Sequence, residues 1–478
     1  MDQPGQKDSV DRRDVLPTVS SVLNDGTIIE LLYDPEESAT ALAVFNAGSW
    51  SVEKCVSLPS GERLVPYAPT NSLIRHRVVL LPSAPEEYGS AEGLLSAIEG
   101  YLYRYIDLTP SFAKVATHYV LLTWLYDAFE ELPYLRFQGD YGTGKTRALL
   151  TLGSLCYKPF FASGASTVSP IFHTLDAFRG TLIFDEADFR FSDEKAELVK
   201  ILNNGNVRGM PVLRTVLNRN REFNPRAFQV YGPKLVAMRG TYDDRALESR
   251  FLTEEMGRAS LRSDIPINLP PEHRQEALHL RNQLLLYRFR NLHREKPDPS
   301  LVQQGLEPRL NQVLVPLLSV METEGAREDL RRLAYGTFSK LAVERGLSVE
   351  AQLLSVVREM SKGADKPSLP LAQLTERFRA EHGSDYDRHI SPRWIGSVLR
   401  QRLRLIPVKS HGVYVLPLTD EAKLAALYGR YGLLDEGGSP PGTHSLSTAA
   451  EGTAASTRVD EVDVVDVRAD AGDGIAAH

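Results

Sequence analysis

Short apolar runs separated by turn-forming residues dominate the first 90 positions of the chain. Between Thr27 and Pro82 the runs TIIELLY, ALAVFNA and RVVLLP alternate with Gly, Pro, Asn and Ser, a pattern typical of short β-strands. From Ala91 to Glu131 the apolar residues instead recur at helical spacing, which predicts helices over 91–106 and 112–131. We therefore expect a small β-rich domain at 1–90, followed by a helical stretch.

The rest of the chain changes pattern three more times. Residues 134–256 alternate strand-like and helix-like segments, as an α/β layer does. Residues 268–362 have an almost continuous helical pattern, and 366–432 predict a compact helical unit with one hairpin. The segment after Asp435 is rich in Gly, Pro, Ser and Thr, which favours a disordered tail. Five parts are predicted: 1–90, an α/β core at 91–265, a helical lid or linker at 266–362, a helix–hairpin domain at 363–434, and an acidic tail at 435–478.

The overall charge of the 478-residue chain hides an uneven distribution. The net charge is −7, but the segment after residue 434 alone holds nine acidic and two basic residues, so the remainder is balanced. An acidic total is therefore no argument against nucleic-acid binding, which depends on local clusters of Arg and Lys. Two cysteines exclude a disulfide framework. The N-terminus lacks an apolar signal core and no run is long enough to cross a membrane, so we expect a cytoplasmic protein without membrane contact.

A phosphate-binding motif occupies the segment LRFQGDYGTGKTRALL. Gly139, Gly144, Lys145 and Thr146 have the G-x-x-x-x-G-K-T spacing of a P-loop, between an apolar strand and a run of helix formers. Backbone N–H groups of such a loop face phosphate oxygens, the lysine reaches the β- and γ-phosphates, and the hydroxyl ligates Mg²⁺. The residues expected to contact ATP are Gly139, Asp140, Tyr141, Gly142, Thr143, Gly144, Lys145, Thr146 and Arg147.

A second motif, GTLIFDEADF, follows the P-loop after some forty residues. Its apolar residues predict a buried strand that delivers Asp185 and Glu186 to the carboxyl edge of the sheet, where nucleotide sites of open α/β sheets lie. We expect Asp185 to hold Mg²⁺ together with Thr146. Glu186 is expected to orient and activate the attacking water.

A third segment, VYGPKLVAMRG followed by TYDDRALESRF, predicts a further strand beside the first two. Arg239 or Thr241 at its end could contact the γ-phosphate or the lytic water. Arg250 is a candidate for an arginine that stabilises charge on the γ-phosphate from a neighbouring subunit. The alternative for each arginine is a surface ion pair with the acidic residues close by.

The order of these motifs resembles the AAA+ ATPases. The phrases LPYLRFQGDYGTGKTRAL, FRGTLIFDEADF and VYGPKLVAMRGTYDDRALESRF are similar to the ATPase domains of phage, plasmid and mobile-element replication proteins, including primase-linked and self-loading helicases. The resemblance covers about a third of the chain, residues 100–256. It implies a hexameric ring, a trans arginine finger at Arg250, and a second sensing arginine from the helical lid, for which Arg309 is the candidate and Arg281 the reserve. The sensor strand departs from the family pattern, because Arg239 replaces the usual Asn.

Two basic clusters are candidates for DNA contact. Residues 206–226 contain five arginines and one acidic residue, and predict a hairpin with a basic tip. Arg214, Arg219 and Arg221 are the expected contacts with single-stranded DNA, and five phosphate contacts would give a salt slope of roughly 3 to 4. In ring helicases of the AAA+ and superfamily 3 kinds, which the motif order resembles, a hairpin at this location lines the pore. A hairpin that contacts a neighbouring subunit is the alternative.

The second cluster, residues 388–419, holds six basic residues and no acidic one. Ser391 and Pro392 predict a helix start, and helices over 371–382 and 393–403 followed by a hairpin match the winged-helix order. Arg393, Arg400 and Lys409 are the expected DNA contacts of this domain. A winged helix used only for protein contact is the alternative.

Together these features predict an α/β protein with a P-loop AAA+-like core, a β-rich N-terminal part, a helical lid and a C-terminal winged helix. The expected function is that of an ATP- and Mg²⁺-dependent DNA translocase or helicase, in replication of a mobile genetic element, with a primase or other replication protein as partner. The alternative is a nucleotide-switched ATPase that assembles or remodels complexes, in DNA loading or defence, without unwinding.

Overall fold

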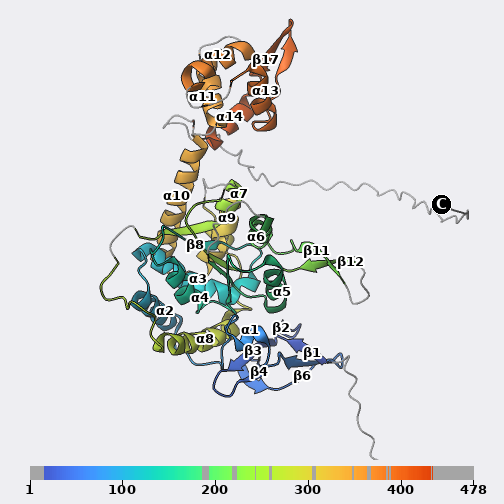
Figure 1. The fold of residues 1–478 in the computed structure, drawn as a ribbon, viewed down its shortest axis with the longest axis vertical. Helices are drawn as coiled ribbons and strands as arrows, with labels where there is room; N and C mark the ends of the chain where they lie inside the picture. Colours follow the sequence, from blue (N-terminus) through green and yellow to red (C-terminus); the bar gives the residue numbers. More distant parts are fainter. Residues whose placement is uncertain are drawn as a thin grey trace, which may run out of the picture. The chain divides into compact units, whose positions relative to one another are not determined.

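The computed structural model describes residues 15–185, 193–217, 223–242, 244–257, 261–303, 308–346, 349–362, 368–383, 386, 389–431 and 433. The chain divides into two compact units, with the division after Ser348. The first unit holds the α/β sheet and the N-terminal strands, and the second holds a small three-stranded sheet with its helices (Figure 1). None of the helices in these ranges is long and apolar enough to span a bilayer.

The N-terminal strands form two small sheets that share the cores of the first unit. The four-stranded antiparallel sheet runs in the order β2 (Ser20–Val22), β3 (Ile28–Asp34), β4 (Ala39–Asn46) and β5 (Ser49–Glu53). The second has the order β1 (Val15–Thr18), β7 (Arg63–Pro66) and β6 (Val56–Ser57), and the short helix α1 (Ser72–Arg75) follows. Because alternate side chains of a strand face opposite sides, Ile28 and Leu32 of β3 enter one large core, while Ile29 and Leu31 enter the other.

A five-stranded parallel sheet lies at the centre of the first unit. Its order is β14 (Phe251–Glu255), β8 (Tyr134–Gln138), β13 (Lys234–Met238), β10 (Leu182–Asp185) and β9 (Phe160–Ser163). The strands are nearly continuous apolar runs, as expected of a parallel sheet covered on both faces. The predicted strand at 234–238 is confirmed, and it lies between the P-loop strand β8 and the acidic strand β10.

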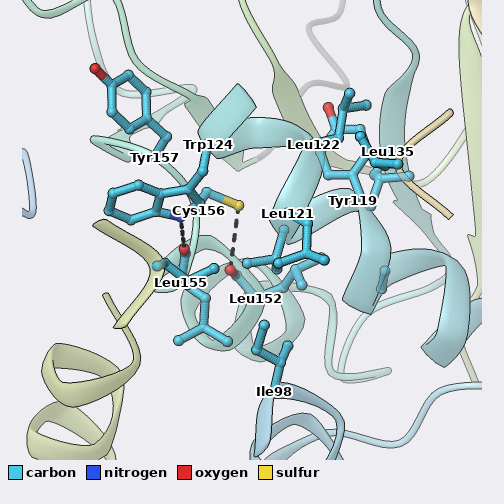
Figure 2. Close-up of a cluster of buried hydrophobic side chains, with 14 of the residues drawn as sticks. Ile98, Tyr119, Leu121, Leu122, Trp124, Leu135, Leu152, Leu155, Cys156 and Tyr157 are labelled. Atoms are coloured by element: carbon cyan, nitrogen blue, oxygen red, sulfur yellow. Dashed lines mark hydrogen bonds between the residues drawn. The ribbon is translucent and has the colours of Figure 1, made fainter. Parts of the chain in front are cut away.

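Helices surround this sheet. Their bounds are α2 (Ala91–Tyr105), α3 (Pro110–Leu125), η2 (Tyr126–Ala128), α4 (Lys145–Gly153), α5 (Val168–Phe178), α6 (Asp193–Asn204), α7 (Arg245–Glu248), α8 (Glu272–Asn291), η3 (Pro299–Leu301), α9 (Pro308–Ser319) and α10 (Glu324–Gly346). Helix α3 is buried on nearly all sides. Figure 2 shows its C-terminal end, where the Trp124 indole donates to the Leu155 carbonyl at 2.8 Å, next to the buried thiol of Cys156. Burial raises the pKa of Cys156, which suits packing and not reactivity.

A buried charge cluster joins the N-terminal strands to the helices. The Glu30 carboxylate on β3 accepts hydrogen bonds from Lys158 at 2.8 Å and from Arg288 of α8 at 2.8 Å. Arg288 also pairs with Asp127 at 2.6 Å. Burial alone would raise the pKa of Glu30, but Lys158 and Arg288 outweigh it and hold that pKa below its usual value. The β-rich N-terminal part is therefore fixed to the α/β part by charges as well as by apolar packing.

A buried histidine predicts how stability changes with pH. His273 of α8 is hydrogen-bonded to the Tyr101 hydroxyl at 2.7 Å, and burial lowers the pKa of His273 to about 4, from an ordinary value of 6.5. Between these two pH values the His273 side chain binds a proton in the unfolded chain but not in the folded one. The free energy of unfolding should therefore fall as pH drops from 6.5 to 4. Urea titrations at a series of pH values measure this slope.

The matched variants for this prediction are His273→Gln, which keeps a side-chain acceptor, and His76→Gln, which changes an exposed histidine. We expect His273→Gln to flatten the acid slope and His76→Gln to leave it unchanged. His118, whose pKa burial also lowers, keeps part of the slope in either variant. A slope that survives His273→Gln in full would contradict the prediction.

The second unit contains α11 (Val349–Ser361), β15 (Ser368–Pro370), α12 (Leu371–His382), α13 (Pro392–Gln401), β16 (Val408–Ser410), β17 (Val413–Pro417) and α14 (Glu421–Arg430). Its antiparallel sheet has the order β15, β17, β16. The expected helix start is present, because the Ser391 hydroxyl accepts from the Trp394 N–H at 3.3 Å and Pro392 takes the first helical position.

Two boundaries of the second unit differ from the expectation. Helix α11, which the sequence pattern placed with the 266–362 lid, contributes Leu353 and Val357 to the apolar core of this unit. The predicted turn at 409–412 is only two residues long, since His411 and Gly412 have φ of 46° and 85°. Two successive left-handed residues make the tight turn that matches strand twist.

Candidate nucleotide site

The loop after β8 has the backbone that a P-loop needs. Gly142 and Gly144 have φ of 74° and 90°, a region in which a side chain would be strained. At Gly139 the constraint is space, because a Cβ would come within 2.7 Å of the Met256 carbonyl. Helix α4 then begins at Lys145, so the unpaired N–H groups and the positive end of its dipole face the loop.

Lys145 lies across the loop that precedes it. Its ammonium donates to the carbonyls of Gly139 at 2.8 Å and Asp140 at 2.6 Å. The Thr143 hydroxyl donates to the same Asp140 carbonyl at 2.9 Å. These contacts place a positive charge beside the loop, where a phosphate chain cradled by its N–H groups would lie.

Thr146 and Asp185 bring the two motifs together. The Thr146 hydroxyl on α4 donates to Oδ2 of Asp185, at the carboxyl end of β10, at 2.7 Å. A hydroxyl and a carboxylate are the hard oxygen ligands that Mg²⁺ prefers, and such sites are usually completed by substrate phosphates and water. Within the described part of the chain, no group of three or more His, Cys, Asp and Glu side chains could hold a metal by itself. The pair therefore fits a Mg²⁺ ion bound together with a nucleotide.

Glu186, the predicted water-activating residue, lies outside the described residues. Arg239 follows β13, the strand between β8 and β10, so it lies between the P-loop and Asp185. Its guanidinium stacks on the exposed ring of Tyr141 in the P-loop, 3.6 Å from the ring centroid. Contact of Arg239 with the γ-phosphate or the lytic water stays a prediction.

Arg147, also predicted as a nucleotide contact, is engaged elsewhere. Its guanidinium donates to the carbonyls of Pro266 and Ile267, in the segment that leads to α8. Arg147 therefore connects the start of α4 to this segment. Nucleotide contact by Arg147 remains a prediction, and it would require these two hydrogen bonds to change.

Arg250 lies at the opposite edge of the sheet from the P-loop. Arg250 immediately precedes β14, and the parallel register of β14 with β8 pairs Phe251 with Tyr134, at the start of the P-loop strand. The Arg250 guanidinium donates to the Leu202 carbonyl at 3.1 Å and to Asn203 at 2.5 Å. Arg309 is close enough to influence the pKa of Arg250, together with Glu131.

The sensing role of Arg309 stays a prediction. Arg281, the reserve candidate, is buried and donates to the Ser154 carbonyl at 2.8 Å. Contact of Arg250 with a neighbouring subunit stays a prediction. Arg250 is only 8% exposed, so that contact would require its hydrogen bonds to Leu202 and Asn203 to change.

The predicted hairpin forms from β11 (Val212–Leu217) and β12 (Phe223–Phe228), which extend outward past α5 and α6 (Figure 1). The three arginines of this segment that the structure describes all have partners within the chain. Arg208 donates to the Phe129 carbonyl at 3.0 Å. Arg214 pairs with Glu197 at 3.5 Å, and Arg226 pairs with Asp176 at 3.1 Å.

Arg214 and Arg226 also stack on Phe172 and Phe228. DNA contact by Arg214 therefore remains a prediction that would compete with its contacts to Glu197 and Phe172. Arg219 and Arg221 lie outside the described residues. In the second unit, Arg393, Arg400 and Lys409 are exposed.

Sequence reasoning missed two buried cations that shape this region. Lys234, at the start of β13, donates to the carbonyls of Gly205, Val230 and Gly232 at 2.9 to 3.1 Å, and so fixes the base of the hairpin. Arg136, in the middle of β8, forms a buried ion pair with Glu248 at 2.7 Å. The only sequence signal for either was a charged residue inside an otherwise apolar strand.

Comparison with known proteins gives weak likenesses only. No family model and no curated protein matches the chain. Among solved structures, the apo C-terminal region of NrS-1 has a TM-score of 0.38 at 12% identity, over 81% of this chain and 96% of that one. SCCmec type IV Cch, an active helicase, has a TM-score of 0.29 at 11% identity, over 85% and 95% of the two chains. JCV helicase has a TM-score of 0.24 at 15% identity, over 55% and 64%. At these low TM-scores the likeness decides neither fold nor activity.

Proposed function

We propose that this protein is a Mg²⁺- and ATP-dependent P-loop ATPase. The observation that carries the proposal is the 2.7 Å hydrogen bond from Thr146 to Asp185, which joins the P-loop helix to the acidic strand. The two motifs are 39 residues apart in the sequence, and they meet at the carboxyl edge of a parallel sheet, where nucleotides bind in such folds. Two left-handed glycines and the ammonium of Lys145 supply the remaining parts of a phosphate site.

Each residue has a distinct task in this proposal. Lys145 binds the β- and γ-phosphates, and Thr146 with Asp185 holds Mg²⁺, which neutralises charge on the phosphates. Glu186 takes a proton from the attacking water. Arg239, between the P-loop and Asp185, is placed to contact the γ-phosphate. Because phosphoryl transfer needs little covalent chemistry from the protein, these electrostatic and positioning roles supply most of the rate enhancement.

A homo-oligomer completes the site in this proposal. Arg250 lies at the edge of the sheet opposite its own P-loop, so it can act on a nucleotide only if that nucleotide is bound to a neighbouring subunit. A ring in which each subunit offers Arg250 to the next satisfies this requirement. An arginine supplied in this way contributes about 10³ to 10⁵ in kcat.

We further propose that ATP hydrolysis drives movement on DNA, in replication of a mobile genetic element. The hairpin of β11 and β12 extends outward from the core (Figure 1), and its sequence places Arg219 and Arg221 between the two strands. Since Arg208, Arg214 and Arg226 have partners within the chain, the single-strand contacts are assigned to this pair. The second unit, with its exposed Arg393, Arg400 and Lys409, is assigned a winged-helix role at duplex DNA.

This assignment changes the expected salt dependence of DNA binding. Each single-strand phosphate contact contributes about 0.7 to the slope of log affinity against log salt. Two arginines per subunit therefore give about 1.4, below the slope of roughly 3 to 4 for five. Fluorescence anisotropy with a labelled oligonucleotide over a series of salt concentrations measures this slope.

Two double variants test the assignment. Arg219→Ala/Arg221→Ala should remove the contribution of the hairpin to the slope. Arg393→Ala/Arg400→Ala should lower duplex binding and leave single-strand binding unchanged. An unchanged slope in the first variant would exclude the hairpin as the single-strand contact.

One observation favours the alternative function, a nucleotide-switched ATPase that assembles or remodels complexes. Leu213 and Phe223 are 70% and 76% exposed, and the register of the hairpin places them on the same face. An exposed apolar face suits contact with protein better than contact with phosphate. Under this alternative the hairpin contacts a neighbouring subunit, and ATP hydrolysis does not respond to DNA.

A further inference from the structure

A fully buried ion pair lies between the P-loop strand and helix α7. Arg136, the third residue of β8, forms a bidentate pair with Glu248 through contacts of 2.7 and 2.8 Å. The same guanidinium donates to the Thr253 hydroxyl at 3.0 Å and lies over the ring of Phe251. Arg136 and Glu248 are 4% and 7% exposed, so both charges depend on each other for solvation.

Glu248 also contacts the loop that follows β13. Its Oε1 also accepts a hydrogen bond from the Tyr242 backbone N–H at 2.6 Å. Tyr242 ends the described segment that follows β13 and that begins with Arg239. One carboxylate thus fixes α7 both to the P-loop strand and to the loop after β13.

The other side of α7 is tied to helix α6. The Asp244 carboxylate, just before α7, accepts from the Asn203 amide at 3.1 Å. Asn203 in turn accepts from Arg250 at 2.5 Å. Glu248 lies two residues before Arg250 in the sequence. The segment that contains both residues is bound to Arg136 of β8 on one side and to Asn203 of α6 on the other.

The energetics suggest that the pair has a role beyond stability. Two charges lose their hydration when they are buried, and well-packed apolar residues of similar volume often stabilise a fold as well or better. The bidentate geometry is directional, however, and an apolar contact is not. A pair of this kind sets the position of α7 relative to β8 more strictly than packing alone would.

We propose that Arg136 and Glu248 are positioning residues that set α7, and with it Arg250, in the orientation that a neighbouring subunit's nucleotide requires. The inference rests on the proposed ATPase function and on the trans role of Arg250. It adds that β8, the strand that precedes the P-loop, also sets the position of Arg250, which the same subunit offers to its neighbour. A displacement of about 1 Å at such a group can cost about 100-fold in rate.

Two variants of the pair test the inference. Glu248→Gln keeps an acceptor for the Tyr242 N–H and removes the charge. The double variant Arg136→Met/Glu248→Leu removes both charges together, which leaves no unpaired ion and should preserve folding. We expect kcat for ATP hydrolysis to fall on the order of 100-fold in both, while KM for ATP stays within about twofold, because the P-loop of the same subunit is intact. Glu30→Gln, in a buried charge cluster away from α7, is the matched control, and its kcat should stay near wild type.

Mixing experiments separate positioning from general damage. Lys145→Ala subunits have no working P-loop but still offer Arg250, so adding them to the double variant should raise hydrolysis severalfold above either protein alone. Arg250→Ala mixed with Lys145→Ala is the reference for such rescue.

The outcomes of these mixtures differ. If the reference pair recovers activity and the double variant does not, or if the double variant has wild-type kcat, the inference is wrong. If the reference pair shows no rescue, the trans role of Arg250 fails and the inference fails with it. Absence of any Lys145-dependent hydrolysis in the wild type would instead refute the proposed function itself.

Discussion

Lys145→Ala should lower kcat for ATP hydrolysis by at least about 100-fold, the scale of losing one charged or hydrogen-bonding group aimed at the transition state. The reason is local. Its ammonium is the positive charge held against the P-loop, through contacts of 2.8 and 2.6 Å with the Gly139 and Asp140 carbonyls. Without it, the charge that develops on the γ-phosphate oxygens loses one of the cations proposed to neutralise it. A coupled phosphate-release assay at saturating Mg²⁺-ATP measures the loss.

Lys114→Ala is the matched control for Lys145→Ala. Lys114 is also a lysine on a helix, but it pairs with Asp329 at 2.8 Å on the surface, and its replacement should leave kcat unchanged. Because Lys145 is partly exposed and makes no ion pair with a described side chain, we expect the two variants to unfold at temperatures close to wild type. Hydrolysis by Lys145→Ala at the wild-type rate would show that the P-loop is not the catalytic site.

Asp185→Asn should lower the rate about 100-fold at low Mg²⁺, and rising Mg²⁺ concentration should partly restore it. The carboxylate that accepts from Thr146 at 2.7 Å is the charged ligand in the predicted metal site, and an amide keeps its shape without its charge. Hydrolysis measured over a Mg²⁺ titration gives the half-saturating concentration, which should rise at least tenfold, or about 1.4 kcal/mol of metal binding.

Two further variants sharpen the Mg²⁺ test. Thr146→Ser keeps the hydroxyl and should retain most of the activity, whereas Thr146→Val removes it and should resemble Asp185→Asn. Asp298→Asn changes a partly exposed carboxylate that accepts from the backbone N–H and the hydroxyl of Ser300 and should leave the Mg²⁺ titration unchanged. A Mg²⁺ response in Asp185→Asn equal to that of the wild type would exclude Asp185 as a metal-site residue.

The elements that local patterns determine were predictable from the sequence. The strand Lys234–Met238, the helix Leu371–His382 and the start of α13 at Pro392 lie where the apolar spacing and the cap signals placed them. The P-loop motif also fixed its own geometry, because two glycines must adopt left-handed backbone conformations there. In each of these cases the information lies within a few residues of the feature.

Features that depend on distant partners could not be predicted in the same way. The hairpin arginines looked free because nothing in residues 206–226 shows that Glu197 of α6 and Asp176 of α5 approach them. The contacts of Arg250 also depend on distant partners, because its guanidinium donates to the Leu202 carbonyl and to Asn203 of α6. The N-terminal strands and the α/β part share two apolar cores, because Ile29 and Leu32 of β3 face opposite sides of their strand. The sequence does not show which segments pack against each of these residues.

In the proposed function, this chain couples ATP hydrolysis at the P-loop to movement on DNA. The most direct measurement is steady-state ATP hydrolysis by the full chain with and without single-stranded DNA, with Lys145→Ala as the blank. We expect hydrolysis above the blank that rises manyfold when DNA is added. Hydrolysis that does not exceed the blank would contradict the ATPase, and hydrolysis that exceeds it but ignores DNA would contradict the motor and favour the nucleotide-switched alternative.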